Sequence, residues 1–378
     1  MNNLKLSLLY TNYGPYHFAR LEAFHELCCQ KGWQAIGVEF ARVERTYDWR
    51  ANFDKLPCEF VCLNPDGVLE EIPFLKLVRQ VFTCLYKLNP DVVIVAGYFD
   101  PGMLAALFWA KVHRKKVICL SESKDDDFLR IQWKEFVKKT IISNYDAAFV
   151  AGKPHARYFH KLGFDKNAIF CGHNAVDNKV YHPDDIAKLP HPLLNISYFL
   201  SINRFVPKKN LITLIKAYAK YYETVPENAW HLVLCGDGEM RLEIEALIDK
   251  LHLTNVIHLT GFLQQHDLLP YFAHAQSFVH ASTTEQWGLV VNEAMASSLP
   301  VLVSNRCGCF EDLIIEGVNG FGFNPENQEQ LTELMLKMSS GEINLKTMGQ
   351  LSLEHIQKYS PDYFAHGLQQ AIEYALSH

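Results

Sequence analysis

The chain has 378 residues, which is more than one ordinary hydrophobic core accommodates and suits two domains of average size. Apolar residues make up 49% of it and charged residues 21%, which is the composition of a globular enzyme. The net charge of −6 argues against wholesale binding of nucleic acid, which calls for a basic surplus.

Short apolar runs alternate with stretches of helical periodicity along the first half of the chain. Strands are expected at residues 4–10, 91–96, 116–120 and 147–151. Helices are expected at residues 18–31, 101–112 and 154–162. Continuous apolar strands that alternate with helices are typical of a parallel sheet covered on both faces.

The alternation stops between residues 181 and 192, where Pro183, Pro190 and Pro192 stand among polar residues, and this stretch is the clearest candidate for a linker. Beyond it, strands are expected at residues 196–202, 231–235, 256–259, 277–280 and 300–303. Helices are expected from Leu211, from Glu239 and, as an isolated last element, at residues 361–376.

We therefore expect an α/β protein of two doubly wound, Rossmann-like domains that face a cleft. The domains are expected at residues 1–180 and 181–360, with a C-terminal segment at 361–378. Ligands of open parallel sheets bind outside the carboxyl ends of the strands. The turns that lead from a strand into a helix are therefore the places to look for site residues.

Two carboxylates flank such a turn in the second domain. Glu285 follows the strand at 277–280, and a helix expected to begin near Trp287 and Gly288 contains Glu293. The N-terminus of a helix suits a phosphate, a glycine allows close approach, and an ionised carboxylate accepts hydrogen bonds from hydroxyls. The pattern favours a nucleotide-sugar, which has phosphates in the middle and hydroxyls at both ends. By itself such a pair of glutamates is more often solvated, and Trp287 fits core packing equally well.

Two further turns of this domain suit the same ligand. Arg204 and Lys209 follow the strand at 196–202 and would converge on a pyrophosphate, where positive groups stabilise the charge of a leaving diphosphate. Gly236-Asp-Gly-Glu239 follows the next strand, and its glycines would let the chain pass close to a ribose or base. The glycine turn is weak evidence alone, because it lacks the third glycine of a dinucleotide fingerprint.

In this order and spacing, the motifs resemble those of the retaining family 4 (group 1) glycosyltransferases, which have the GT-B fold. The residues that carry the resemblance are Arg204, Lys209, Gly236-Asp-Gly-Glu239, Gly261-Phe262, Glu285, Glu293-Ala-Met-Ala, Cys309-x-Glu311 and Asn319-Gly320. The resemblance covers essentially all of the second domain. It implies transfer of a hexose from a UDP- or GDP-linked donor to a hydroxyl of a saccharide, lipid-linked or small-molecule acceptor. It also implies retention of the anomeric configuration, no metal ion or other cofactor, and a last helix that crosses back to the first domain.

The resemblance also implies roles for individual residues. Glu285 would be catalytic and face the hydroxyls of the donor sugar, and Glu293 would bind the ribose. Arg204 and Lys209 would bind the diphosphate. The remaining donor-binding residues would be Gly236, Glu239, Phe262, Trp287, Gly288 and Leu289, the last three through their N–H groups.

The first domain offers candidates for the acceptor side. Gly14 stands where family members place a glycine loop beneath the donor phosphates, although a single glycine departs from their usual pair, and a structural turn is the alternative. His17 is a candidate for contact with the acceptor or for a cap. Asp100 and Glu122 follow the strands at 91–96 and 116–120 and are candidates to accept the acceptor's proton, the alternative being a helix cap or a positioning group. Many family members carry a histidine near the turn of Glu122, so the proton path stays open.

Two rival functions remain. One is a GT-B epimerase that acts on a nucleotide-sugar without an acceptor, and release of free nucleotide together with a glycoside would exclude it. The other is a non-catalytic sugar-binding protein, against which the intact set of Glu285, Glu293, Arg204 and Lys209 speaks.

Location and partners follow from what the chain lacks. It shows no signal peptide and no uninterrupted apolar span, and its ten cysteines lack the spacing of a metal site, so we expect reduced thiols and a cytoplasmic protein. The amphipathic stretch 133–142 and the basic stretch 111–116 allow peripheral contact with the inner membrane surface. An ordinary surface helix is the favoured interpretation. The sequence sets no oligomeric state.

Overall fold

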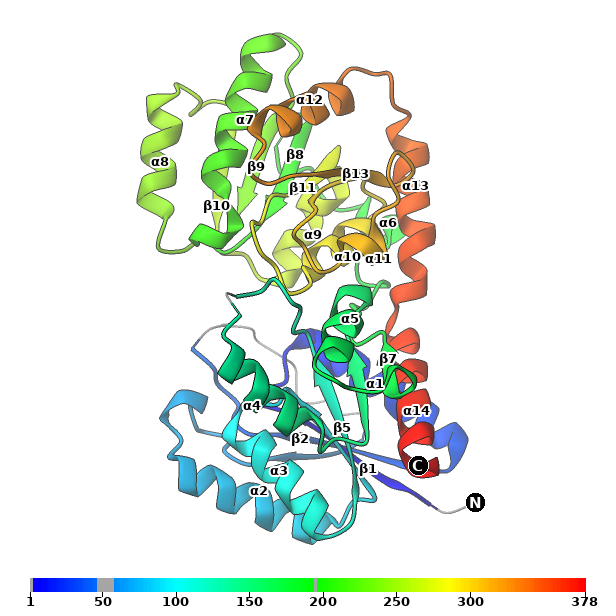
Figure 1. Ribbon diagram of the computed structural model, residues 1–378. Coiled ribbons are helices and arrows are strands. Elements are labelled where there is room, and N and C mark those ends of the chain that lie inside the picture. Colours follow the sequence, from blue (N-terminus) through cyan, green and yellow to red (C-terminus); the bar gives the residue numbers. More distant parts are fainter. Residues whose placement is uncertain (1–2, 46–57, 129, 194–195) are drawn as a thin grey trace. The chain divides into compact units, whose positions relative to one another are not determined.

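The computed structural model describes residues 3–45, 58–128, 130–193 and 196–378 (Figure 1). These residues form two compact units. Unit 1 comprises Met1–Asp177 and Tyr359–His378, and unit 2 comprises Asn178–Lys358. The chain therefore enters unit 2 at Asn178 and returns to unit 1 at Tyr359.

The described part of unit 1 contains a sheet of seven parallel strands in the order β3-β2-β1-β4-β5-β6-β7. The strands are β1 (Lys5–Tyr10), β2 (Gln34–Glu39), β3 (Glu59–Cys62), β4 (Val92–Ala96), β5 (Lys116–Ser121), β6 (Ala147–Val150) and β7 (Ile169–Cys171). Side chains alternate along a strand, so Leu8 and Ile94 belong to one core layer and Leu9 and Val95 to the other. Both faces are buried, which explains why β4 is apolar throughout.

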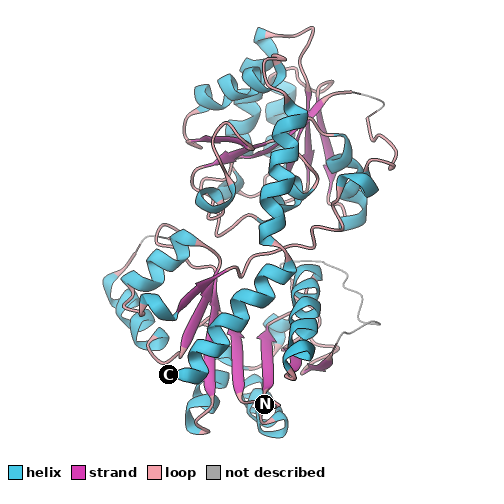
Figure 2. Ribbon diagram, turned by 90° about the vertical axis from the view of Figure 1, so that its right-hand side faces the viewer, coloured by secondary structure: helices cyan, strands magenta, loops and turns pink. Residues whose placement is uncertain are grey.

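Helices cover both faces of this sheet. They are α1 (Pro15–Lys31), α2 (Phe74–Leu88), α3 (Pro101–Val112), α4 (Gln132–Ile142), α5 (Lys153–Lys161) and α14 (Pro361–Ser377). Helices α1 and α14 pack together on one face, and α2 and α3 pack together on the other. Figure 2 shows α14 running across the strands of unit 1. This confirms that the last helix crosses back to the first domain.

The described part of unit 2 contains a sheet of six parallel strands in the order β10-β9-β8-β11-β12-β13. The strands are β8 (Tyr198–Ile202), β9 (His231–Cys235), β10 (Ile257–Gly261), β11 (Ser277–His280), β12 (Val301–Ser304) and β13 (Gly320–Phe323). Its helices are α6 (Pro183–Ile186), α7 (Leu211–Thr224), α8 (Arg241–Lys250), α9 (Gln265–His274), α10 (Leu289–Ala296), α11 (Phe310–Leu313), α12 (Gln328–Ser339) and α13 (Leu345–Ile356). One core joins α7 and α12 to alternate residues of β8, β9 and β12.

These two parallel sheets confirm the predicted α/β class, and each strand expected from an apolar run is present. The stretch 181–192 differs from its interpretation as a linker. It lies inside unit 2, contains α6, and buries the side chains of Tyr181 and Ile186. No helix in the described ranges is both long and apolar enough to cross a membrane.

Candidate donor site and acceptor-side residues

Glu285 lies in the turn between β11 and α10, at the carboxyl edge of the unit 2 sheet. Its side chain is only 11% exposed, and a buried carboxylate requires partners. Lys209 donates a hydrogen bond to it, and Lys208 Nζ lies 3.5 Å from its Oε1 atom. Ser282 Oγ donates to Oε2 over 3.4 Å, and His280 Nε2 lies 3.6 Å from the same oxygen. Two ammonium groups around one carboxylate leave a surplus of positive charge, which suits an anionic ligand.

These partners also set the charge state of Glu285. Burial alone would raise its pKa, but the contact with His280 and the charges of Lys209 and Lys208 outweigh burial and lower the pKa below 4.5. Burial lowers the pKa of His280, so its imidazole is neutral at physiological pH. The carboxylate of Glu285 is therefore ionised at physiological pH, and the lysines supply the opposite charge.

Two neighbouring loops hold the turn of Glu285 in place. Thr283 N donates to Lys208 O over 2.8 Å, which joins the turn to the 3-10 helix Pro207–Lys209. On the other side Gly308 N donates to Glu285 O over 3.0 Å. Glu285 is therefore presented by a turn that backbone hydrogen bonds fix on both sides.

Gly288 caps the N-terminus of α10 with φ of 101°, a conformation that favours glycine. A Cβ atom there would lie 3.5 Å from Glu285 Cγ, so backbone conformation and not space demands the glycine. The first turn of α10, beginning at Leu289, carries the N–H groups that a helix leaves unpaired at its start. The Trp287 side chain lies in the core, 1% exposed, and its Nε1 atom donates to Asn292 Oδ1 over 2.9 Å. Only the backbone of Trp287 therefore remains a candidate for ligand contact.

The turn after β9 packs directly on the turn after β8. A Cβ atom at Gly236 would lie 1.8 Å from Asn203 O, and one at Gly238 would lie 2.6 Å from Phe205 O. Both glycines have positive φ, 137° and 157°. They therefore have a packing function that needs no ligand: they bring together the two turns that carry the candidate residues.

Three other predicted donor-binding side chains lie at the same edge of the unit 2 sheet. Arg204 follows β8, Glu239 precedes α8, and Phe262 follows β10. All three are exposed, and Phe262 is 52% exposed although it is aromatic. Such side chains are accessible to a ligand in unit 2.

Glu293 is in α10 and is 3% exposed. Tyr181 Oη donates a hydrogen bond to its Oε1 atom over 2.7 Å, and Gln265 Nε2 donates to Tyr181 Oη over 2.9 Å. The second predicted carboxylate is thus also held by side chains from distant parts of the sequence.

In unit 1, Gly14 and His17 form the start of α1. Gly14 N donates to His17 Nδ1 over 3.0 Å, and the His17 ring packs 4.2 Å from the Tyr10 ring. Burial, helped by the charge of Arg20, lowers the pKa of His17 to about 3. His17 is therefore a neutral capping residue in this structure, which is the alternative that the sequence left open.

Asp100 is the N-cap of α3. Its Oδ1 atom accepts hydrogen bonds from Gly102 N over 2.7 Å and Met103 N over 3.3 Å. Burial raises the pKa of Asp100, and the two hydrogen bonds oppose that rise. A capping function accounts for this carboxylate, as the alternative interpretation proposed.

Glu122 directly follows β5, and its side chain is 34% exposed. His173 Nδ1 lies 3.7 Å from Glu122 Oε1, and Tyr10 Oη lies 3.4 Å from His173 Nε2. Burial and the nearby charge of Arg20 lower the pKa of His173 well below its usual value, so the imidazole is neutral. Glu122 thus lies beside a histidine from a distant part of the sequence, whereas His17 and Asp100 cap helices.

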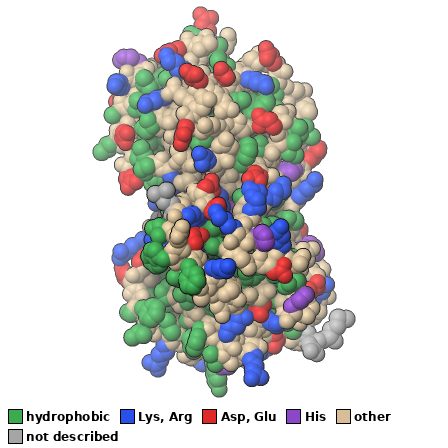
Figure 3. All heavy atoms as spheres, viewed as in Figure 1, with side chains coloured by type: hydrophobic (Ala, Val, Ile, Leu, Met, Phe, Trp, Pro, Cys, Tyr) green, Lys and Arg blue, Asp and Glu red, His purple; other side chains and the backbone are tan. Residues whose placement is uncertain are grey.

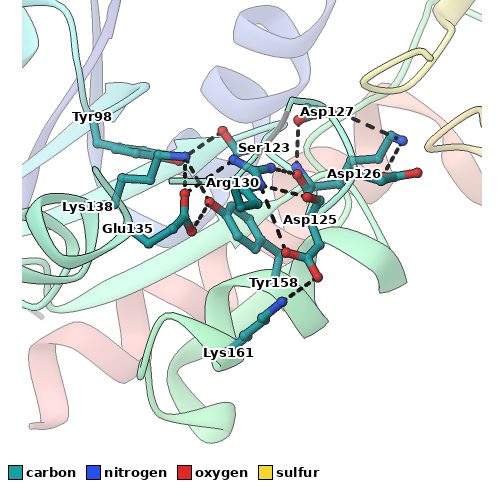
Figure 4. Close-up of polar contacts among 11 residues, drawn as sticks. Tyr98, Ser123, Asp125, Asp126, Asp127, Arg130, Glu135, Lys138, Tyr158 and Lys161 are labelled. Carbon is teal, nitrogen blue, oxygen red and sulfur yellow. Dashed lines mark hydrogen bonds and ion pairs between the residues drawn. The ribbon is translucent and has the colours of Figure 1, made fainter. Parts of the chain in front are cut away.

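Helix α4 turns part of its polar side inward. The Glu135 side chain, 23% exposed, accepts hydrogen bonds from Tyr158 Oη and Lys138 Nζ, each over 2.7 Å. The Arg130 guanidinium lies over the Tyr158 ring, 4.4 Å from its centroid. Figure 4 shows this network between α4, α5 and the loop after β5.

The opposite side of α4 and the loop before it form what we call the α4 face, consisting of Phe128, Ile131, Trp133, Phe136 and Val137. All five are exposed, with Trp133 at 64% and Phe136 at 71%. Figure 3 shows hydrophobic side chains gathered over the region of α4, with Lys and Arg side chains among them. The amphipathic pattern is therefore confirmed, but its apolar side faces solvent.

Within the described ranges, no group of three or more His, Cys, Asp or Glu side chains is placed to hold a metal ion. All ten cysteines are free thiols.

The architecture of the whole chain matches that of known glycosyltransferase structures. HepE of Anabaena, in complex with UDP and glucose, superposes with a TM-score of 0.76 over 98% of this chain and 99% of that chain, at 18% identity. Two parallel-sheet units with a returning C-terminal helix define the GT-B fold, which confirms the predicted fold class.

Residues 192–353 match the model of the family described as glycosyl transferases group 1. The chain is 29% identical over 164 residues to alpha-monoglucosyldiacylglycerol synthase of Acholeplasma laidlawii, a match that covers 43% of this chain but only 40% of that relative. It is 24% identical over 320 residues to an uncharacterized glycosyltransferase of Methanocaldococcus jannaschii, covering 81% of this chain and 84% of that one. Unit 2 is therefore similar to group 1 glycosyltransferases in sequence.

The structure adds partners that the sequence did not reveal. Lys208, His280 and Ser282 surround Glu285, while Tyr181 and Gln265 hold Glu293. Lys208 adjoins the predicted Lys209 in the sequence, so it could have been predicted as a second cation near Glu285. The other partners are visible only once the chain is folded.

Proposed function

We propose that the protein is a retaining, metal-independent glycosyltransferase that moves a hexose from a UDP- or GDP-linked donor to an acceptor hydroxyl. The supporting observation is the meeting of Lys208, Lys209 and Glu285 beside the N-terminus of α10. Fixed positive groups at a helix N-terminus stabilise the charge that develops on a leaving diphosphate. The family match of unit 2 supports the same conclusion.

In this proposal different residues bind different parts of the donor. Arg204 and Lys209 bind the diphosphate, together with the N–H groups of Gly288 and Leu289. Glu285 accepts hydrogen bonds from hydroxyls of the donor sugar, and Glu293 accepts them from the ribose. The backbone of Trp287 and the residues Gly236, Glu239 and Phe262 complete the donor surface.

Reaction with retention breaks the bond between the anomeric carbon and the diphosphate oxygen. The acceptor oxygen then bonds the same face of that carbon, and the acceptor loses its proton. Glu122 is the carboxylate of unit 1 that we assign to the acceptor side, because Asp100 and His17 serve as helix caps. The acceptor is a saccharide, a lipid-linked carrier or a small molecule.

A panel of UDP-, GDP- and ADP-sugars, each offered with and without a chelator, tests this function. We expect turnover of at least one donor in the chelator and an NMR spectrum of the product that shows the anomeric configuration of the donor. Activity that a chelator abolishes would disprove metal independence, and an inverted product would disprove retention. If no donor binds, and Glu285→Ala and Arg204→Ala change nothing, the glycosyltransferase proposal fails.

We further propose that unit 1 makes peripheral contact with an anionic membrane surface through the α4 face. Its exposed aromatic residues would otherwise face water, and the exposed Lys134 and Lys139 supply positive charge beside them. A second copy would bring the same lysines into opposition, so charge favours a bilayer over self-association. The similarity to alpha-monoglucosyldiacylglycerol synthase, whose name describes a glucosylated lipid product, supports a lipid acceptor.

Vesicle flotation tests this contact. We expect the protein to float with vesicles of phosphatidylglycerol and phosphatidylcholine, to bind less at high salt, and to lose binding in Trp133→Ser/Phe136→Ser. The control Leu242→Ser removes an equally exposed apolar side chain from unit 2 and should bind like the wild type. The proposal would be contradicted if the double variant bound vesicles as well as the wild type does. It would also be contradicted if the wild type formed a concentration-dependent dimer that the double substitution abolished.

A further inference from the structure

The carboxylate of Glu293 is held by a side chain from another part of unit 2. We propose that Tyr181 is a positioning residue that fixes this carboxylate for the ribose hydroxyls of the nucleotide, and that Gln265 in turn orients the Tyr181 hydroxyl. The inference rests on the proposed function, because it takes Glu293 as the ribose ligand.

The direction of each hydrogen bond follows from the chemistry of the three groups. Tyr181 Oη donates its proton to Glu293 Oε1 over 2.7 Å, and the carboxyl oxygen accepts. The lone pairs of the same hydroxyl then accept from Gln265 Nε2 over 2.9 Å. The glutamine amide thus directs the phenolic proton toward the carboxylate, in a place where both Tyr181 and Glu293 are buried.

Packing fixes the position of the Tyr181 hydroxyl. The Tyr181 ring meets the Phe272 ring of α9 edge to face, with centroids 5.6 Å apart and planes at 83°. Gln265 is the first residue of the same helix. Helix α9 therefore supports both the ring and the hydroxyl of Tyr181, so that its oxygen lies at a defined point beside α10.

This arrangement suits a carboxylate that must bind a diol. A carboxylate has about four acceptor positions, so one bond from Tyr181 is compatible with two more from the 2′ and 3′ hydroxyls of a ribose. The bond at Oε1 restricts rotation of the carboxylate before the ligand arrives, which lowers the entropy lost on binding. Tyr181→Phe keeps the ring and its packing on Phe272 but removes the hydrogen bond to Glu293 Oε1.

The test compares binding of two ligands by calorimetry: the ribonucleoside diphosphate that the wild type prefers, UDP or GDP, and its 2′,3′-dideoxy analogue. We expect Tyr181→Phe to bind the ribonucleotide about tenfold more weakly, the usual size of a lost hydrogen bond to a charged group, and the dideoxy analogue nearly as the wild type does. Gln265→Leu should weaken binding of the ribonucleotide by about threefold and change binding of the dideoxy analogue little. Catalysis is not needed for this readout.

Tyr198→Phe is the matched control. It removes another buried tyrosine hydroxyl of unit 2, whose hydrogen bond goes to Tyr271 O over 2.8 Å, and it should leave both affinities unchanged. Equal weakening of both ligands in Tyr181→Phe would show a merely structural role and overturn the inference, as would no weakening at all. If Tyr181→Phe fails to fold, Gln265→Leu decides by the same criterion.

The outcome for the wild type separates this inference from the function on which it rests. A wild type that binds neither UDP nor GDP refutes the proposed function. A wild type that binds the ribonucleotide and the dideoxy analogue equally well refutes the ribose contact, and with it the inference, but leaves the donor site around Glu285 standing.

Discussion

Lys209 donates a hydrogen bond to the carboxylate of Glu285 and thereby joins the turn after β8 to the turn after β11. The two side chains are only 13% and 11% exposed, so water solvates the charge of either one poorly if the other is removed. In a donor complex the same ammonium group would also face the diphosphate. The pair therefore links the stability of unit 2 to its proposed chemistry.

Removing the lysine alone should destabilise unit 2 more than removing both charges. Lys209→Met leaves the Glu285 carboxylate buried with one cation fewer, and we expect a loss of about 2 kcal/mol in the free energy of unfolding. Lys209→Met/Glu285→Gln should recover part of it, because no buried charge then lacks its partner. Urea unfolding of the two variants measures the difference. A double variant no more stable than Lys209→Met would contradict this account.

Substitutions at Lys209 and Glu285 should also lower catalytic activity. Lys209→Ala and Glu285→Ala should each lower kcat by about a hundredfold or more, the usual loss when a group that stabilises transition-state charge is removed. Turnover of the preferred donor at saturation measures the effect. Lys220→Ala breaks an exposed ion pair with Glu223 on α7 and should leave kcat unchanged. A loss confined to KM would show that these residues bind ground state and transition state alike.

Acid should weaken the fold through Glu285. Its pKa is lowered in the folded protein, so its contribution to stability is full above the ordinary value of 4.5 and is lost as the pH falls below it. We expect the wild type to lose more unfolding free energy than Glu285→Gln between pH 6 and pH 3. Parallel curves for the two proteins would show that the lysines do not stabilise the carboxylate.

Much of the fold was predictable because its central strands are continuous apolar runs, as in β4 and β5, and buried strands need no alternation. Strand β3 was not predicted, since it is only half-buried and begins with Glu59. Strand β13 (Gly-Phe-Gly-Phe) was also missed, because its glycines resemble a turn.

The candidate site, like the fold, has some features that the sequence predicts and others that appear only in the folded structure. Glu285 and Lys209, which the structure brings into contact, could be proposed from the sequence because their residue types and spacing are local. The Asp100-Pro101 pair already carried the signature of a helix start that the structure shows. Tyr181 and Gln265 were not found, because they meet Glu293 only through long-range packing. Local patterns reveal caps and motif residues, whereas the side chains that orient them depend on the tertiary fold.

Gly236→Ala should be among the most damaging small substitutions. Its Cβ atom would lie 1.8 Å from Asn203 O, and φ at this residue is 137°. We expect a loss above about 3 kcal/mol in the free energy of unfolding, because the backbone of the turn after β8 must move. Gly341→Ala is the matched control: φ is 81° there, but nothing lies within 4 Å, so only about 1 kcal/mol should be lost. Similar losses for both variants would assign the effect to φ alone.

The histidine of the α1 cap gives the protein a second response to acid, this time in unit 1. His17 has a pKa of about 3 in the folded chain against 6.5 ordinarily, so the unfolded chain binds more protons below pH 6.5. Its contribution to stability therefore falls as the pH drops from 6.5 toward 3, by about 3 kcal/mol at pH 4.5, two units below 6.5. His17→Gln retains an acceptor for Gly14 N without titrating, so its stability should decline less. NMR of the imidazole nitrogens provides a direct check, and protonation near pH 6 would refute the assignment.

Asp100 and Glu122 are both carboxylates at the carboxyl edge of the unit 1 sheet, and Asp100 is the N-cap of α3. Asp100→Ala should lower the free energy of unfolding by about 1 kcal/mol and leave kcat nearly unchanged, since it removes two hydrogen bonds at the start of α3. Glu122→Gln keeps the size of its side chain but loses the charge that faces His173, and it should lower kcat with little effect on stability. A pH profile of kcat/KM for Glu122→Gln that lacks the acidic limb of the wild type would support proton acceptance by this residue. If Asp100→Ala abolishes turnover while Glu122→Gln retains it, the assignment of the two carboxylates must be reversed.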